Sequence, residues 1–188
     1  MADRPKAAGG RSVALLRAVN VGGRAQVSMS DLRKLVTDLG FLEVQSLLQS
    51  GNIVFCPGRK SAATLERLFE AEAAARLDLR TDFFVRSCDE WAAVIAANPF
   101  RREAERDPSH LVVMFLKHAP TKSAVTAARQ AITGPEQAEV EGRHLYIVYP
   151  AGIGRSRLTS SLIEAKLDTR GTGRNWNTML KLADIVGA

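Results

Sequence analysis

Residues 44–56 read VQSLLQSGNIVFC, which is the pattern of two short strands joined by a tight turn. The expected strands cover residues 44–48 and 53–56, and the polar run Gln49-Ser50-Gly51-Asn52 lies between them. A hairpin set among helical and strand-like segments indicates an α+β fold.

The segments around this hairpin extend the pattern. Residues 13–18 read as a buried strand, a polar glycine loop follows at 20–24, and a helix is expected to start near Ser30, a good N-cap residue. A long helix at 61–77 and a strand at 81–86 follow the hairpin. The first half of the chain therefore has the order βαββαβ.

The second half of the chain repeats the order of elements of the first half, but the residues themselves show no convincing repeat. A short helix at 89–97 and a charge-balanced stretch at 101–108, read as a solvated linker, lead into it. The elements expected next are a strand at 111–116, a helix from 120, strands at 137–140 and 145–149, a helix to about 166, a weak strand at 167–170 and a helix at 177–186.

This order predicts two ferredoxin-like βαββαβ units in tandem, each an antiparallel sheet with its helices on one face. The first unit is expected over residues 12–87 and the second unit, with a C-terminal helix, over 110–186. A bridging helix and linker are expected at 88–109.

The same topology predicts which loops share an end of a sheet. The loop at 20–24 should meet the turn at 49–52, because the first and third strands are neighbours about 5 Å apart. In the second unit, the loop at 152–157 should lie near residues 174–176.

Composition excludes several classes of protein. The 188 residues are 46% apolar and 24% charged, which is typical of a globular protein that folds without a disulfide or a metal. Cys56 and Cys88 lack the spacing of a metal or redox motif and are read as ordinary thiols. The sequence has neither a signal-peptide core nor an apolar run long enough for a membrane span, which predicts a soluble, cytoplasmic protein.

The charge balance favours an anionic partner. The formal net charge is +6, and 19 arginines stand against 7 lysines. Arginine suits phosphate and carboxylate groups, although a basic balance speaks first to non-specific association.

The glycine loop of the first half is one candidate anion site. Backbone amides at Gly22 and Gly23 could hold an anion with help from Arg17 or Arg24, or the glycines could merely turn the chain. No Gly-Lys-Ser/Thr follows, so this is not a phosphate-binding P-loop.

The second candidate is the loop that contains Gly152-Ile153-Gly154. Arg157 stands where a dinucleotide fingerprint needs its third glycine, which excludes a Rossmann site. Arg155 and Arg157 are expected at a helix N-terminus, where cations oppose the helix dipole unless an anion lies between them. Further along, Trp176 could stack on a base or anchor the core, and Asn175 could cap the last helix.

Catalytic constellations are not evident in the sequence. His110 and His118 flank one expected strand and lie too far apart to share a metal. There is no Gly-x-Ser-x-Gly elbow, and the loops are rich in Arg, Asn, Gln and Ser, which bind well but transfer protons poorly. The first strand has no aromatic residue and the third has only Phe55, which argues against an RNA-binding sheet surface.

Four of these segments together carry a family resemblance. Residues 15–23 (LLRAVNVGG), 31–33 (DLR), 49–55 (QSGNIVF) and 174–178 (RNWNT) resemble the signatures of the bacterial domain of unknown function (DUF) 1697 family. The family pattern usually has glycine where Ala18 stands. The resemblance implies a paired ferredoxin-like arrangement and brings no established activity.

The leading hypothesis is non-enzymatic binding of a phosphate-bearing ligand, either a nucleotide or nucleic acid, in a basic cleft. A small enzyme acting on an anionic metabolite and a protein-interaction module are the alternatives. No cofactor, metal or membrane is expected, and the oligomeric state is left open. The expected ligand-binding residues are Arg17, Asn20, Gly22, Gly23, Arg24, Gln49, Ser50, Asn52, Arg155, Ser156, Arg157, Arg174, Asn175 and Trp176.

Overall fold

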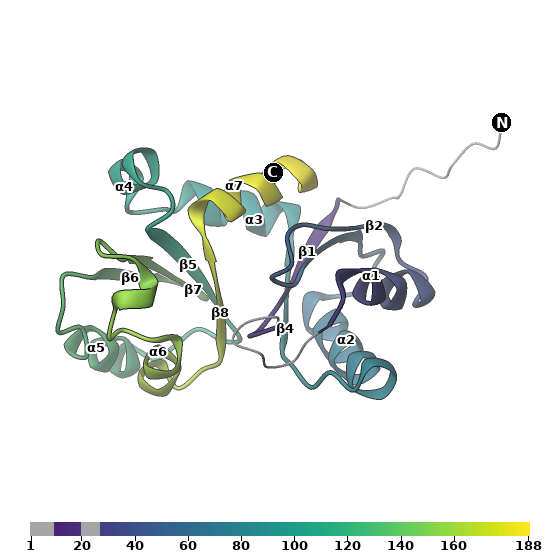
Figure 1. Cartoon of the computed structure of the whole chain (residues 1–188), viewed down its shortest axis with the longest axis horizontal. Helices are drawn as coiled ribbons and strands as arrows, with labels where there is room; N and C mark the ends of the chain where they lie inside the picture. The colour runs from purple at the N-terminus through teal and green to yellow at the C-terminus, as the bar shows by residue number, and fades with distance from the viewer. Residues whose placement is uncertain (1–9, 20–26) are drawn as a thin grey trace. The chain divides into compact units, whose positions relative to one another are not determined.

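Two four-stranded antiparallel sheets organise the chain, which is described here by a computed structural model of residues 10–19 and 27–188 (Figure 1). Contacts divide these residues into two units. Unit 1 holds the residues up to Ala92 together with Leu182–Ala188, and unit 2 holds Ala93–Lys181.

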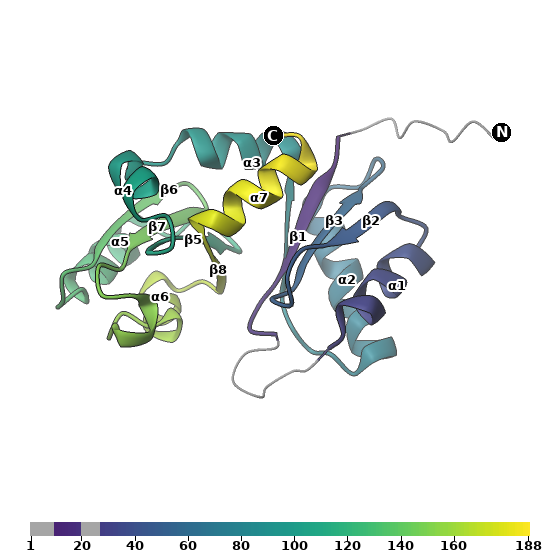
Figure 2. The same ribbon diagram turned by 45° about the horizontal axis from the view of Figure 1, so that its top comes forward.

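The sheet of unit 1 has the strand order β2-β3-β1-β4. Every neighbouring pair of strands in it is antiparallel. Helices α1 and α2 cover one face of this sheet (Figure 2). The elements are β1 (Ser12–Leu16), α1 (Met29–Asp38), β2 (Leu42–Ser46), β3 (Asn52–Cys56), α2 (Ala62–Leu77) and β4 (Phe83–Ser87), followed by α3 (Cys88–Ala96).

The sheet of unit 2 has the matching order β6-β7-β5-β8, again antiparallel throughout. Its α5 and α6 cover one face. The elements are α4 (Arg101–Arg106), β5 (Leu111–Leu116), α5 (Lys122–Gln130), β6 (Gln137–Glu141), β7 (His144–Val148), the short 3₁₀ helix η1 (Ile153–Arg155), α6 (Ser160–Leu167), β8 (Gly171–Asn175) and α7 (Trp176–Val186). The βαββαβ order occurs twice, so the prediction of tandem ferredoxin-like units is confirmed.

The core of unit 1 lies between its sheet and its two helices. Four phenylalanine rings form its centre, one from the residue before β2 and one each from β3, α2 and β4. Phe69 of α2 touches all three others, with ring centroids 5.3 Å from Phe41, 5.2 Å from Phe55 and 5.6 Å from Phe83. Edge-to-face and tilted pairs of this kind add to the stabilisation from burial alone.

Local chemistry sets both ends of the first helix, and its N-cap lies two residues earlier than the sequence predicted. Ser28, not Ser30, is the N-cap, and its hydroxyl accepts a hydrogen bond from the Asp31 amide at 3.0 Å. Such a cap satisfies an amide that the helix itself leaves without a partner. The helix ends at Asp38, and Gly40 with φ +87° turns the chain away.

Strand β2 also differs from its prediction, because it ends at Ser46 rather than residue 48. A bulge lies between Leu42 and Gln45, with Glu43 at φ 53°. The Asn52 side-chain amide donates to the Leu47 carbonyl at 2.8 Å, which draws Leu47 out of the strand and into the turn.

The last strand lies four residues beyond its predicted place. Asp168 at φ 51° closes α6, and β8 begins only at Gly171. A Cβ on Gly171 would lie 2.5 Å from Met114 Cε, and one on Gly173 would lie 3.1 Å from Val112 Cγ1. These positions take glycine because β8 passes close to the side chains of β5.

Strands β4 and β8 are edge strands of their sheets. Glutamate side chains of α2 and α6 accept hydrogen bonds from backbone amides on these edges. The amides of Phe83 and Val85 donate to Glu70 at 3.0 Å and Glu66 at 2.8 Å. In unit 2 the Gly171 amide donates to Glu164 at 2.9 Å. These carboxylates satisfy backbone donors that the sheets leave without a strand partner.

The charged stretch at 101–108 is largely exposed, as its composition indicates, but residues 101–106 form the helix α4 instead of an irregular linker. No helix in the described part of the chain combines the length and the apolar character that crossing a bilayer requires.

Candidate functional site

The end of β1 and the β2–β3 turn lie side by side in unit 1, as the topology predicts. The Leu16 amide donates to the Gly51 carbonyl at 2.9 Å. Gly51 has φ +73°, and a Cβ there would lie 2.6 Å from Val19 Cγ2. The predicted site residues Asn20, Gly22, Gly23 and Arg24 lie outside the described residues.

The remaining polar residues predicted at this end of the sheet differ in burial. Asn52 is completely buried, and its amide bonds the Leu47 carbonyl and the Ser50 hydroxyl. Gln49 is exposed at the tip of the turn, and Arg17 is half-buried. Asn52 therefore has a clear structural role in the turn.

In unit 2 the residues from Gly152 to Leu158, here named the arginine loop, form a closed loop between β7 and α6. The Gly152 amide donates to the Tyr149 carbonyl at 2.8 Å, and the Tyr149 hydroxyl donates to the Leu158 carbonyl at 3.1 Å. The Ser156 hydroxyl donates to Glu136 and accepts from the Leu158 amide. The backbone of the loop is thus held at both ends and in the middle.

Two arginines extend from this loop. Arg155 and Arg157 are exposed, and neither makes an ion pair or a side-chain hydrogen bond with any described residue. The sequence placed them at the start of a helix, but α6 begins later, at Ser160, with Thr159 as its N-cap. The two arginines therefore precede the helix and are not part of its first turn.

Residues 174–176 form the end of β8 and the start of α7, where Asn175 and Trp176 serve the fold. Asn175 Oδ1 accepts from the Thr178 amide and hydroxyl, both at 2.9 Å, which caps the helix. Trp176 is buried. The register places Val148 opposite Leu111 and Asn175 opposite Val112, so the arginine loop and residues 174–176 do share an end of the sheet.

Arg174 is buried rather than displayed in a loop. Its guanidinium donates to the Thr172 hydroxyl at 2.8 Å and to the Gly173 carbonyl at 2.7 Å. Burial lowers the pKa of Arg174 to about 10, so the group is still charged at neutral pH. Arg86 of unit 1 is its counterpart, because Arg86 pairs with Val13 of β1 as Arg174 pairs with Val113 of β5.

Arg174→Ala should lower the free energy of unfolding by about 1–3 kcal/mol, because buried acceptors lose their donor. Arg102→Ala, at an exposed position of α4 in the same unit, removes the same side chain and should stay within about 0.5 kcal/mol. Urea unfolding of both variants measures the difference. If Arg174→Ala is as stable as Arg102→Ala, the buried guanidinium does not stabilise the fold.

A histidine–aspartate pair that the sequence analysis overlooked lies beside the arginine loop. His110 Nδ1 bonds Asp107 Oδ2, and the Ser109 hydroxyl donates to the other carboxylate oxygen at 2.7 Å. The hydrogen bonds from Ser109 and His110 lower the pKa of Asp107. His110 Nε2 lies 3.5 Å from where a Cβ on Gly152 would stand. In the sequence, the spacing of Asp107 and His110, three residues apart after a charged stretch, could have indicated this pair.

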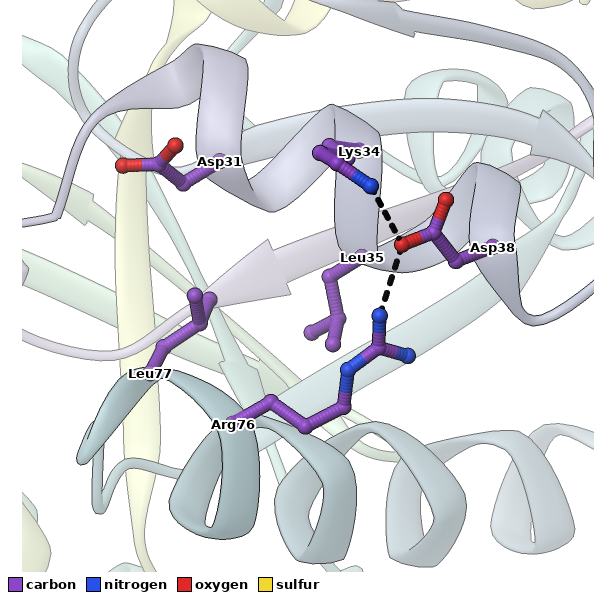
Figure 3. A pocket seen from close by; sticks show the side chains of 6 residues that line it. All are labelled: Asp31, Lys34, Leu35, Asp38, Arg76 and Leu77. Atoms are coloured by element: carbon purple, nitrogen blue, oxygen red, sulfur yellow. Dashed lines mark hydrogen bonds and ion pairs between the residues drawn. The ribbon is translucent and has the colours of Figure 1, made fainter.

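A shallow hollow of about 200 Å³ lies between α1 and α2 in unit 1 (Figure 3). Asp38 accepts from Lys34 at 2.8 Å and from Arg76 at 2.6 Å, and these hydrogen bonds lower its pKa. The two cations already have a carboxylate partner, so this cluster ties the helices together at the surface and leaves little capacity for a ligand.

No group of three or more His, Cys, Asp or Glu side chains within residues 10–19 and 27–188 is arranged to hold a metal ion. Both cysteines are free thiols. Burial raises the pKa of the Cys56 thiol, and the Cys88 thiol donates to the Gly187 carbonyl at 3.4 Å.

The fold and its loops define a class of two-unit ferredoxin-like proteins, and comparison with known proteins gives the family. The model of the family described as "Protein of unknown function (DUF1697)" matches residues 10–146, and the chain belongs to this family. No curated protein matches the chain.

Among solved structures with the same fold is the conserved bacterial protein SP0830 from Streptococcus pneumoniae. Its sequence is 22% identical, and the TM-score is 0.72 over 95% of this chain and 99% of that chain.

Proposed function

We propose that this protein binds a phosphate-bearing ligand, such as a nucleotide, through the arginine loop of unit 2, without catalysing a reaction on it. The observation that carries the proposal is the pair Arg155 and Arg157. Both side chains are exposed and make no polar contact with the described residues, while hydrogen bonds hold the backbone beneath them. A loop held in this way loses little conformational entropy when an anion binds.

The surroundings of the loop support an anionic ligand. Arginine offers several donors in a planar fork that matches phosphate oxygens. The formal net charge of +6 attracts anions at long range. Glu136 offsets part of the local charge, but its carboxylate is engaged by Ser156.

Burial of the central strands favours a small ligand over base-stacked RNA. RNA-binding sheets of this topology display aromatic residues on their open face. Every residue of β1, β3 and β5 is buried, so neither face of these strands offers a stacking surface. Nucleic acid would have to bind through its phosphates alone.

Catalysis on an anionic metabolite is a second candidate function, favoured by one observation. His110 and Asp107 form a bonded pair of the kind that can transfer protons, next to the same loop. Turnover of phosphomonoesters by the purified protein, lost in His110→Asn, would support this function over simple binding.

The double variant Arg155→Ala/Arg157→Ala should bind pyrophosphate about tenfold more weakly than the native protein, because two exposed charge pairs contribute about 1 kcal/mol or slightly more in total. Isothermal titration calorimetry at low ionic strength measures the affinity. Added salt should weaken binding to the native protein, because it screens exposed charges.

Arg101→Ala/Arg102→Ala is the matched control, because it removes two exposed arginines and the same net charge from α4 in the same unit. This control should bind pyrophosphate within about twofold of the native protein, since exposed charges that do not contact the anion are largely screened. Equal losses in both double variants would mean that only the overall charge attracts the anion. Native protein that fails to bind pyrophosphate at all would end the proposal.

A further inference from the structure

The Nε2 atom of His110 is a polar group with no assigned role at the edge of the arginine loop. The side chain is half-buried and extends from the junction of α4 and β5. Backbone bonds fix this junction, because the His110 amide donates to the Asp107 carbonyl at 3.1 Å and its carbonyl accepts from the Tyr149 amide at 2.9 Å. Tyr149 is also the residue that anchors the first turn of the loop.

The partner on the other ring nitrogen decides which nitrogen exchanges a proton. Asp107 is held as a carboxylate by bonds from Ser109 and His110, and a carboxylate can only accept. The Nδ1 atom must therefore carry hydrogen. The proton that comes and goes is the one on Nε2, which lies 3.5 Å from the Cβ position of Gly152 and has no hydrogen-bond partner among the described residues.

We propose that His110 is a third ligand group of the arginine-loop site, one that donates to the bound oxyanion through Nε2–H only when the imidazole is protonated, with Asp107 as its positioning residue. This inference rests on the function proposed above and adds a regulation to it. The preferred ligand is one that ends in a phosphate group with two negative charges. For an oxyanion that keeps both charges, affinity then rises as the pH falls.

The charged groups around the imidazole agree with this assignment. On its own junction Asp107 is the bonded carboxylate. The arginine loop, whose Gly152 lies next to the imidazole, carries Arg155 and Arg157 three and five residues further along the chain. Glu136, next to the loop, is bonded to Ser156. Histidine is the side chain type whose unperturbed charge change falls between about pH 5 and 8.

Sulfate is the probe that isolates the histidine, because it keeps both charges over this pH range whereas a phosphate monoester loses one near pH 6. Native protein should bind sulfate about three- to fivefold more tightly at about pH 5.5 than at about pH 8, which is the contribution of one partly exposed charge pair. His110→Asn should bind with equal affinity at both pH values. His118→Asn, at an exposed position after β5, should keep the native pH dependence.

Two further measurements separate the possible failures. Arg155→Ala/Arg157→Ala should weaken sulfate binding at both pH values and keep its pH dependence. Asp107→Asn should shift the pH midpoint downward, because the carboxylate favours the imidazolium. Binding that depends on the arginines but not on pH, or that keeps its pH dependence in His110→Asn, overturns the role of His110 and leaves the proposed function intact.

The ring resonances of His110 give a readout in the native protein. Saturating sulfate should shift them and raise the pH at which they titrate, because a bound dianion stabilises the imidazolium. A His110 titration unchanged by sulfate, in protein that calorimetry shows to be saturated, would overturn the inference without relying on any variant.

Discussion

Phe69→Ala should lower the free energy of unfolding by about 3–5 kcal/mol, the usual cost of emptying a buried phenylalanine site. Phe69 is completely buried and is the common partner of Phe41, Phe55 and Phe83. Removing its ring deletes three aromatic contacts and leaves a cavity between α2 and the sheet. Chemical denaturation with both fluorescence and circular dichroism measures the loss.

Phe69→Leu is the matched control, because it keeps most of the apolar volume and removes only the ring. It should cost clearly less than Phe69→Ala, about 1–2 kcal/mol, since volume-conserving apolar exchanges are better tolerated. If the two variants unfold at the same denaturant concentration, the four rings do not form the cooperative centre of unit 1.

Gly51→Ala should destabilise the protein by about 2–4 kcal/mol for two separate reasons. With φ +73°, an alanine would occupy the left-handed region at a cost of about 1 kcal/mol. Its Cβ would also stand 2.6 Å from Val19 Cγ2 and 2.8 Å from Leu16 Cβ, and overpacking of that kind costs about 1–3 kcal/mol.

Gly58→Ala separates the two costs, because Gly58 has φ +63° but no atom within 4 Å of its Cβ position. It should lose only the conformational part, about 1 kcal/mol. Thermal unfolding of both variants gives the comparison. Equal losses would show that the contact between the turn and the end of β1 is loose enough to accept a methyl group.

The parts of the fold that local chemistry determines were predictable from the sequence. The hairpin was recognisable because its turn residues and flanking apolar runs lie within thirteen residues of each other. Strand β8 was misplaced because its glycines have low strand propensity, and the reason for them is a distant one. Gly171 is required by Met114 and Leu116, which are far away in sequence.

The candidate site was predictable in residue type but not in exposure. Asn52, Arg174 and Arg155 all belong to residue types that bind anions or polar ligands, yet only Arg155 is exposed to solvent. Which polar side chain a fold buries depends on packing across the sheet. The pairing of His110 with Asp107 also depends on where α4 ends, which the composition of that stretch did not indicate.

The helix glutamates that accept hydrogen bonds from β4 and β8 affect how readily the sheets could pair with another chain. A sheet edge attracts another extended chain only where its backbone donors are free, and here Glu66, Glu70 and Glu164 already occupy donors on those edges. The opposite edge of unit 1 is interrupted by the bulge in β2. The regular edge that remains is β6, where Glu139 is paired with Arg129 and Glu141 is exposed, so identical copies that approach there bring charged side chains together. Each of these edges therefore has a charged side chain or a bulge that opposes edge-to-edge pairing, even where the strands themselves are rich in apolar residues.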